Sequence, residues 1–194
     1  MSQLSPPDPD SAFIAHEEGR EELHFRRIDM RGFKRPDGLF EVEGRITDRK
    51  PHDFTSPNGT RHVPANDPIH HMGVRLIFDE QMIVRGIETF TDSAPYPDCW
   101  QGGLALQALQ GLCIGSGWTR AVRERLPASH TCTHLRELLL PLASAAYQAL
   151  TEHRRLRPEA VDIQGKPIKI DSCYAYGSTR SLVRRRWPGW AGKE

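Results

Sequence analysis

Five side chains of types that commonly bind metal ions stand at the boundaries of predicted elements. His70 and His71 come directly before a predicted strand, Cys99 begins a helix, and Cys132 and His134 begin the longest helix. Imidazole nitrogens and thiolate sulfurs are the usual donors of protein zinc sites and also bind iron. The pattern predicts a metal site formed by His70, Cys99, Cys132 and His134.

The order of the predicted elements explains how these residues would meet. In an antiparallel meander, the start of the second strand and the end of the third lie at the same end of the sheet. His70 and Cys99 would then converge, and a helix docked with its N-terminus at that end would add Cys132 and His134. Neighbouring residues on a strand face opposite sides, so only one of His70 and His71 faces the site. The sequence leaves open which one.

The cysteines have a second interpretation. A helix N-terminus favours the thiolate form that binds metals, which suits Cys99 and Cys132. Free cysteine is also one of the residues most often buried as a small apolar group. Cys113 lies in an apolar run and is expected in the core, whereas Cys173 is a candidate for one further ligand.

Two carboxylates near these residues are candidates for acid–base catalysis. Asp98 precedes Cys99, and Glu137 lies one helical turn after His134. The alternative is that both simply face solvent. Arginines that converge near the site would bind an anionic substrate, and otherwise they form a solvated surface. The candidates are Arg26, Arg27, Arg31, Arg45, Arg120, Arg123, Arg125, Arg184, Arg185 and Arg186.

The elements that would position these side chains follow from the periodicity of the apolar residues. Alternation with a period of two predicts three strands, and a period near 3.6 predicts three helices, with Pro141 expected to kink the last one. Gly44 is expected at a β-bulge. The predicted strands cover residues 39–48, 72–79 and 82–90, and the helices cover 99–112, 119–126 and 133–156.

The remaining segments set the domain boundaries. Residues 1–20 are rich in Pro, Asp, Ser and Glu, which predicts a mobile arm. Residues 51–69 contain four prolines and form a long loop or hairpin tip, and residues 168–174 read as a further strand. We therefore expect a single α+β domain over residues 21–190, with a small antiparallel three-stranded sheet packed against helices.

Composition excludes several classes of protein. The 194 residues include 26 Lys plus Arg and 25 Asp plus Glu, and this balance is not that of a dedicated nucleic-acid binder. No apolar run approaches the ~20 residues that span a bilayer, and no secretory signal is visible, so we expect a cytoplasmic protein without membrane or nucleic-acid partners. The four cysteines include no CxxC pair and are expected to be reduced.

Most of the chain, from about residue 24 to 190, resembles a bacterial family defined only as a domain of unknown function. The most specific part of this resemblance is the run Cys-Thr-His-Leu-x-Glu-Leu at residues 132–138. Further matching positions include His70, Cys99 and Cys173. The resemblance implies no activity.

The layout is also similar, more distantly, to the IscU/NifU-type iron–sulfur scaffold proteins, which place cysteines at three such junctions. This resemblance implies an IscU/NifU-like fold, with His70, Cys99 and Cys132 near the three ligand positions and His134 beside the third. The first position is His here instead of Cys, and an Asp expected shortly after it is absent. A fixed zinc or iron site on a related framework fits these departures better than a transient cluster.

These observations lead to one functional expectation and two alternatives. The first is a metal-dependent enzyme, a hydrolase or lyase, in which zinc or iron polarises a carbonyl or activates water. Its substrate would be a small anionic organic molecule such as an acyl-CoA or an aromatic acid. The alternatives are an iron–sulfur assembly or metal carrier protein, and a binding module with a structural zinc. A second copy of the chain is a further candidate partner.

Overall fold

The computed structural model describes residues 19–155 and 158–192, which form two compact units divided between Leu150 and Thr151. The arm predicted for residues 1–20 lies, apart from residues 19 and 20, outside the described residues. The single domain predicted over residues 21–190 spans both units. No helix among the described residues is both long and apolar enough to cross a membrane.

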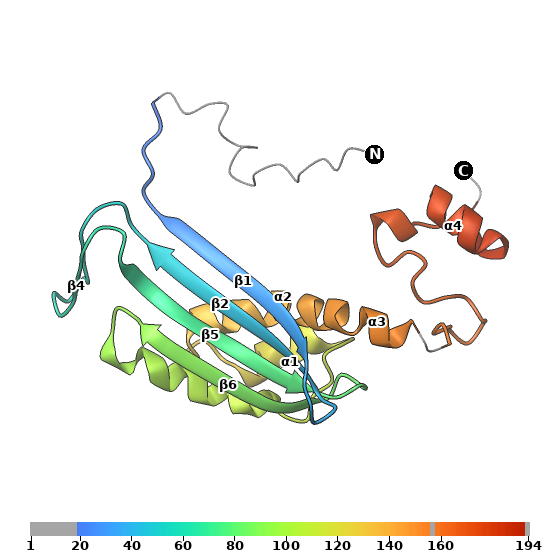
Figure 1. Ribbon diagram of the computed structural model, residues 1–194, viewed down its shortest axis with the longest axis horizontal. Helices are drawn as coiled ribbons and strands as arrows, with labels where there is room; N and C mark the ends of the chain where they lie inside the picture. The colour runs from blue at the N-terminus through green and yellow to red at the C-terminus, as the bar shows by residue number, and fades with distance from the viewer. Residues whose placement is uncertain (1–18, 156–157, 193–194) are drawn as a thin grey trace. The chain divides into compact units, whose positions relative to one another are not determined.

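The first unit is built on a four-stranded antiparallel sheet with the order β1-β2-β5-β6 (Figure 1). The expected sheet had three strands, and the missing one is β1. Its sequence, FRRIDMRGFK, mixes charged and apolar residues on both faces, so it lacks the alternation that identifies a strand. The strands are β1 (Phe25–Lys34), β2 (Phe40–Arg49), β5 (Pro68–Phe78) and β6 (Val84–Ser93).

Strand β2 carries the clearest alternation, and its even-numbered residues face the core. Phe40, Val42 and Ile46 are buried on this face, and Asp48 continues the same series at the end of the strand. The expected bulge at Gly44 is wrong, because pairing with β1 and β5 is regular there. Gly44 instead permits close packing, since a Cβ at this position would lie 3.1 Å from the side chain of Leu142.

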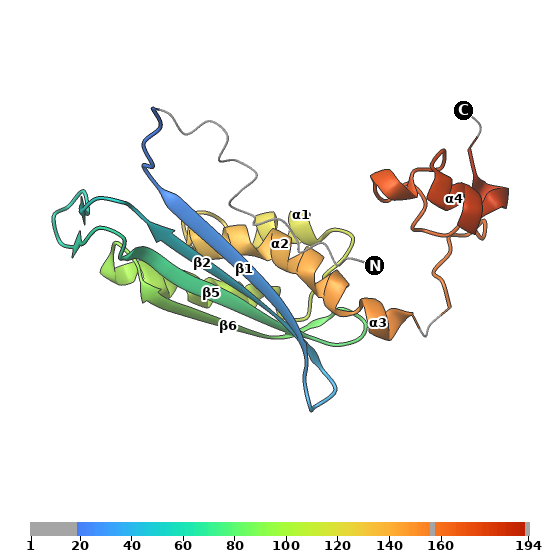
Figure 2. The ribbon, with the colours of Figure 1, turned by 45° about the horizontal axis from the view of Figure 1, so that its top comes forward.

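Helix α2 (Thr133–Ala149) packs on β1, β2 and β5 and lies on one face of the sheet (Figures 1 and 2). It continues through Pro141, whose ring nitrogen has no hydrogen to donate to the carbonyl of Glu137. The helix ends at Ala149 and not near residue 156 as predicted. Its apolar stripe lies in the core and contains Leu135, Leu138, Leu139, Leu142 and Ala146.

Shorter elements complete the first unit. The helix predicted at residues 99–112 is a 3-10 helix, η2 (Pro97–Leu109), which packs against β6. Helix α1 (Trp118–Arg125) contacts both η2 and α2. The proline-rich segment forms the hairpin tip of β3 (Phe54–Thr55) and β4 (His62–Val63).

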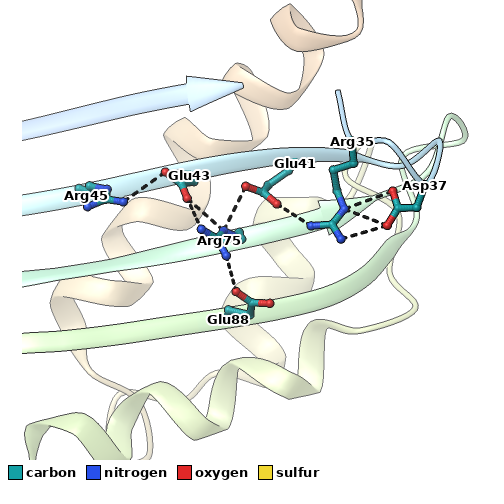
Figure 3. A network of polar contacts seen from close by, with 7 residues as sticks. All are labelled: Arg35, Asp37, Glu41, Glu43, Arg45, Arg75 and Glu88. Atoms are coloured by element: carbon teal, nitrogen blue, oxygen red, sulfur yellow. Dashed lines mark hydrogen bonds and ion pairs between the residues drawn. The ribbon is translucent and has the colours of Figure 1, made fainter. Parts of the chain in front are cut away.

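The face of the sheet opposite α2 carries a network of charged residues (Figure 3). Arg75 on β5 contacts carboxylates on both neighbouring strands, with Nε 3.1 Å from Glu41 and 3.0 Å from Glu43, and Nη1 2.6 Å from Glu88. Arg35 bonds to the second oxygen of Glu41 at 2.9 Å. These contacts tie β2, β5 and β6 together on the polar face.

The second unit, from Thr151 onward, consists of short elements and turns. Residues 168–173, predicted as a strand, form turns and bends. Glu159 accepts hydrogen bonds from Arg186 at 3.3 Å and from the indole of Trp187 at 2.8 Å. The elements are α3 (Thr151–Arg154), η3 (Tyr174–Tyr176), α4 (Ser181–Arg186) and η4 (Pro188–Trp190).

Candidate metal centre

Asp48, His70 and His134 converge at one end of the sheet, and each offers an atom that could bind a metal ion. The three atoms all lie within 4.8 Å of one another, although the residues come from three different elements. We call these three residues the His–Asp cluster. It is the one group of three or more His, Cys, Asp or Glu residues suited to holding an ion in the described part of the chain.

The strand pairing and the docking of α2 explain why these residues meet. Asp48 and His70 are direct partners in the β2–β5 register, so their side chains stand on the same face. That face is the core side, which α2 covers. His134 lies in the first turn of α2, and its ring centroid is 3.9 Å from that of His70.

The distances within the cluster are compatible with shared coordination of one ion. Oδ2 of Asp48 lies 3.0 Å from Nδ1 of His70 and 3.9 Å from Nε2 of His134. Two ligand atoms at about 2.1 Å from one divalent ion lie roughly 3.0 to 3.4 Å apart at coordination angles near 90° to 109°. The distance from Asp48 to His70 lies in this range, and His134 would have to approach Asp48 by about 0.5 Å or more to bind the same ion.

His70 is in the chemical form that binds metals. Burial and the neighbouring His134 lower its pKa to about 4, so the imidazole is neutral near pH 7. Its Nδ1 is buried and has no hydrogen-bond partner in the described structure, although Oδ2 of Asp48 lies 3.0 Å away. Burial, with the charge of Arg26, also lowers the pKa of His134. An ion in the cluster would give the unpartnered nitrogen a ligand bond.

Asp48 is also held in place by two residues near the start of β1. The guanidinium of Arg26 on β1 donates from Nε to Oδ1 at 2.7 Å and from Nη2 to Oδ2 at 2.9 Å, and Nε2 of His24 lies 3.1 Å from Oδ1. Burial alone would raise the pKa of Asp48, but the hydrogen bonds and charge of Arg26 outweigh it and lower the pKa. Asp48 is therefore ionised, and its orientation is fixed as expected of a ligating carboxylate.

One side of the cluster is open to solvent. The side chains of Asp48 and His70 are 3% and 14% exposed, whereas that of His134 is 27% exposed. Arg26 and Glu137, which are joined by a 3.0 Å hydrogen bond, are 33% and 48% exposed. A small molecule could therefore approach from the side of β1 and α2.

The structure brings together two of the four predicted metal ligands. His70 and His134 belong to the cluster, whereas Cys99 and Cys132 do not. Cys132 packs against the core with Sγ 3.7 Å from Sδ of Met72, and Cys99 is half-buried in η2. His71 points to the opposite face, where its Nδ1 lies 3.2 Å from Asp92.

The other predicted site residues have different positions. Glu137 lies at the edge of the cluster through its bond to Arg26. Asp98 is exposed on η2 and is not part of the cluster in the described structure. Cys113, expected in the core, is exposed, and Cys173 is exposed in the second unit. Arg26 is the candidate arginine that bonds directly to a cluster residue.

Sequence reasoning missed Asp48 as a ligand, and Arg26 and His24 as its supports. Asp48 had a recognisable signal, because it continues the buried, even-numbered face of β2 with a charged residue. A carboxylate on a core-facing position is rarely placed there without a partner. The roles of Arg26 and His24 could not be found, because β1 was not identified as a strand.

Comparison with curated proteins and with solved structures gave no match, so the resemblance to the iron–sulfur scaffold proteins gains no support from a known structure. A family model described as a protein of unknown function, DUF2889, matches residues 24–148. This match contains the whole His–Asp cluster, together with Arg26 and His24. The chain therefore belongs to the DUF2889 family.

Proposed function

We propose that this protein is a metal-dependent enzyme that uses the His–Asp cluster to act on a small organic substrate. The observation that carries the proposal is the convergence of Asp48, His70 and His134 around a buried, unpartnered imidazole nitrogen. Unsatisfied buried polar atoms are rare in folded proteins and call for a specific explanation. A metal ligand bond supplies one here.

The donor set favours a single zinc ion, with iron(II) as the alternative. Two imidazoles and one carboxylate form catalytic zinc sites, and the same set binds iron in non-haem oxygenases. An iron–sulfur cluster is held mainly by cysteine thiolates. Neither Cys99 nor Cys132 belongs to the His–Asp cluster. These facts favour a site for one metal ion over a role in iron–sulfur cluster assembly.

The open side of the site favours catalysis over a structural role. Structural zinc sites are usually closed by four protein ligands, whereas catalytic sites keep three and leave a position for water or substrate. The cluster has three donors, and His134 is partly exposed. A bound divalent ion would polarise a carbonyl or activate water, which suits hydrolysis of an ester, amide or thioester.

The test is reconstitution of the full chain after removal of metal with a chelator. Protein reloaded with zinc, iron(II) or manganese would be assayed on esters, amides and thioesters of aliphatic and aromatic acids, including acyl-CoA thioesters. We expect activity that is lost on chelation, restored by one equivalent of one metal, and absent in His134→Ala. The matched control, His71→Ala, removes an imidazole from the opposite face and should stay active. Equal activity with and without metal would contradict the proposal.

A further inference from the structure

We propose that Arg26 binds the carboxylate of an anionic substrate beside the His–Asp cluster, and that Glu137 occupies this position in the free protein. This inference rests on the proposed function and narrows its substrate class to small organic acids. It starts from the way the described residues use the five N–H groups of the Arg26 guanidinium.

One edge of the guanidinium is committed to Asp48. Nε donates to Oδ1 at 2.7 Å and Nη2 donates to Oδ2 at 2.9 Å, which is the bidentate geometry of a strong arginine–carboxylate pair. Asp48 is almost fully buried, so this contact is shielded from solvent. Arg26 is therefore held in a fixed orientation relative to the cluster.

The outer edge of the guanidinium is only partly used. Nη1 donates one hydrogen bond, at 3.0 Å, to Oε2 of Glu137. Together with the two bonds to Asp48, the described residues use three of the five N–H groups. The edge formed by Nη1 and Nη2 can bind a carboxylate in the bidentate manner, whereas Glu137 makes only one bond, through Nη1.

The contact between Arg26 and Glu137 is easily displaced. Glu137 is 48% exposed and makes a single bond to the guanidinium, and exposed ion pairs of this kind contribute little because water screens them. A substrate carboxylate that makes two bonds would replace it. Glu137 is thus a carboxylate already standing where the substrate's carboxylate would bind.

The position of this edge fixes the kind of substrate. Glu137 follows His134 by three residues on α2, so the two side chains lie on the same face of the helix. A carboxylate bound to Arg26 would lie next to the cluster, with the rest of the molecule free to reach the metal. The structure thus fits a small acid whose reacting carbonyl is a few bonds from its carboxylate.

The experiment measures binding of succinate to zinc-loaded full-length protein by calorimetry at constant ionic strength, with dimethyl succinate as the uncharged probe. Removing the competing charge in Glu137→Gln should tighten succinate binding by about three- to tenfold, and dimethyl succinate should not bind. The matched control is Glu124→Gln, which removes another exposed carboxylate, paired with Arg120 on α1, and should change nothing. Arg26→Lys keeps the charge but loses the bidentate edge and should weaken binding about tenfold or more.

Metal content measured on the same samples separates this inference from the proposed function. One zinc per chain with no succinate binding, or equal effects of Glu137→Gln and Glu124→Gln, would overturn the role of Arg26 and leave the metal site standing. Absence of zinc from the wild-type protein would overturn both. Circular dichroism shows whether Arg26→Lys folds. If it does not fold, succinate binding by Glu137→Gln, which changes an exposed position, tests the role of Arg26.

Discussion

Asp48 and His70 are direct partners across strands β2 and β5, and their side chains bring a carboxylate oxygen and an unpartnered imidazole nitrogen to 3.0 Å. The pair lies on the buried face of the sheet, where the N-terminus of α2 adds His134. This relationship explains why one end of an otherwise apolar core is polar.

The first prediction concerns pH and the stability of the metal-free protein. The folded pKa of His70 is about 4, below its ordinary value of 6.5, so between these values the unfolded chain binds more protons. Stability should therefore fall as pH decreases from about 6.5 to about 4, with His70 contributing about 3 kcal/mol of the loss. Burial also lowers the pKa of His134, which acts in the same direction.

Urea unfolding at several pH values, in the presence of a chelator, measures this effect. In His70→Asn the proton-linked loss from residue 70 is removed, and the free energy of unfolding should depend less steeply on pH in this window. His71→Asn, which changes the neighbouring imidazole on the other face, serves as the control. Identical slopes for wild type and His70→Asn would show that His70 titrates normally.

The second prediction concerns Gly102, which lies against the start of α2. A Cβ at this position would be 2.5 Å from the backbone nitrogen of Cys132, so Gly102→Ala must displace the helix N-terminus that carries His134. We expect a loss of about 1–3 kcal/mol in stability. Metal affinity should also weaken about tenfold, although residue 102 is no ligand.

Gly86→Ala is the matched control for Gly102→Ala. Its added Cβ would meet the Ile77 side chain at 3.4 Å, an ordinary contact, on a strand away from the cluster. Thermal unfolding and a chelator-competition titration on both variants make the comparison. Equal metal affinity in the two variants would mean that the position of α2 does not control the cluster.

The third prediction concerns the charged network on the other face of the sheet (Figure 3). Arg75→Met removes the cation shared by Glu41, Glu43 and Glu88, and the half-buried Glu43 loses the partner that lowers its pKa. We expect a loss of about 1–2 kcal/mol in stability at pH 7, because the carboxylates of β2 and β6 lose the cation that lies between them on β5.

The loss caused by Arg75→Met should shrink with salt and at low pH. Glu43 has a lowered folded pKa, so its stabilising contribution is present above its ordinary pKa and disappears as pH falls through the folded value. Arg120→Met, which breaks an isolated pair with Glu124 on α1, should change stability by about 0.5 kcal/mol or less. Urea unfolding that finds equal costs for the two variants would contradict the network's role.

The parts of the fold predicted from sequence are those with one clear periodicity. Strands β2, β5 and β6 alternate, and α2 has a continuous apolar stripe, so their positions were predicted to within a few residues at most ends. Strand β1 escaped because it is an edge strand with charges on both faces. The end of α2 was placed too late, because residues 150–155 carry on the helical composition.

The candidate site was predicted only in part, because Asp48 was not among the predicted ligands although it pairs with His70 across β2 and β5. Ligands were expected at the start of β5 and the end of β6, because these ends meet at one end of a meander. The same argument applies to the end of β2, which pairs with the start of β5 and supplies Asp48. Cysteines were expected as soft donors, whereas Cys132 packs against the core beside Met72.

The most direct test of the central claim is the metal content of the protein purified without an affinity tag, compared across four variants. We expect about one zinc or iron per chain in the wild type, in Cys99→Ala and in Cys132→Ala. In His134→Ala and Asp48→Asn, metal affinity should fall by at least about tenfold, and the purified protein should contain correspondingly less metal. Metal retained in the His134 and Asp48 variants, or lost in the cysteine variants, would contradict the assignment of the site to Asp48, His70 and His134.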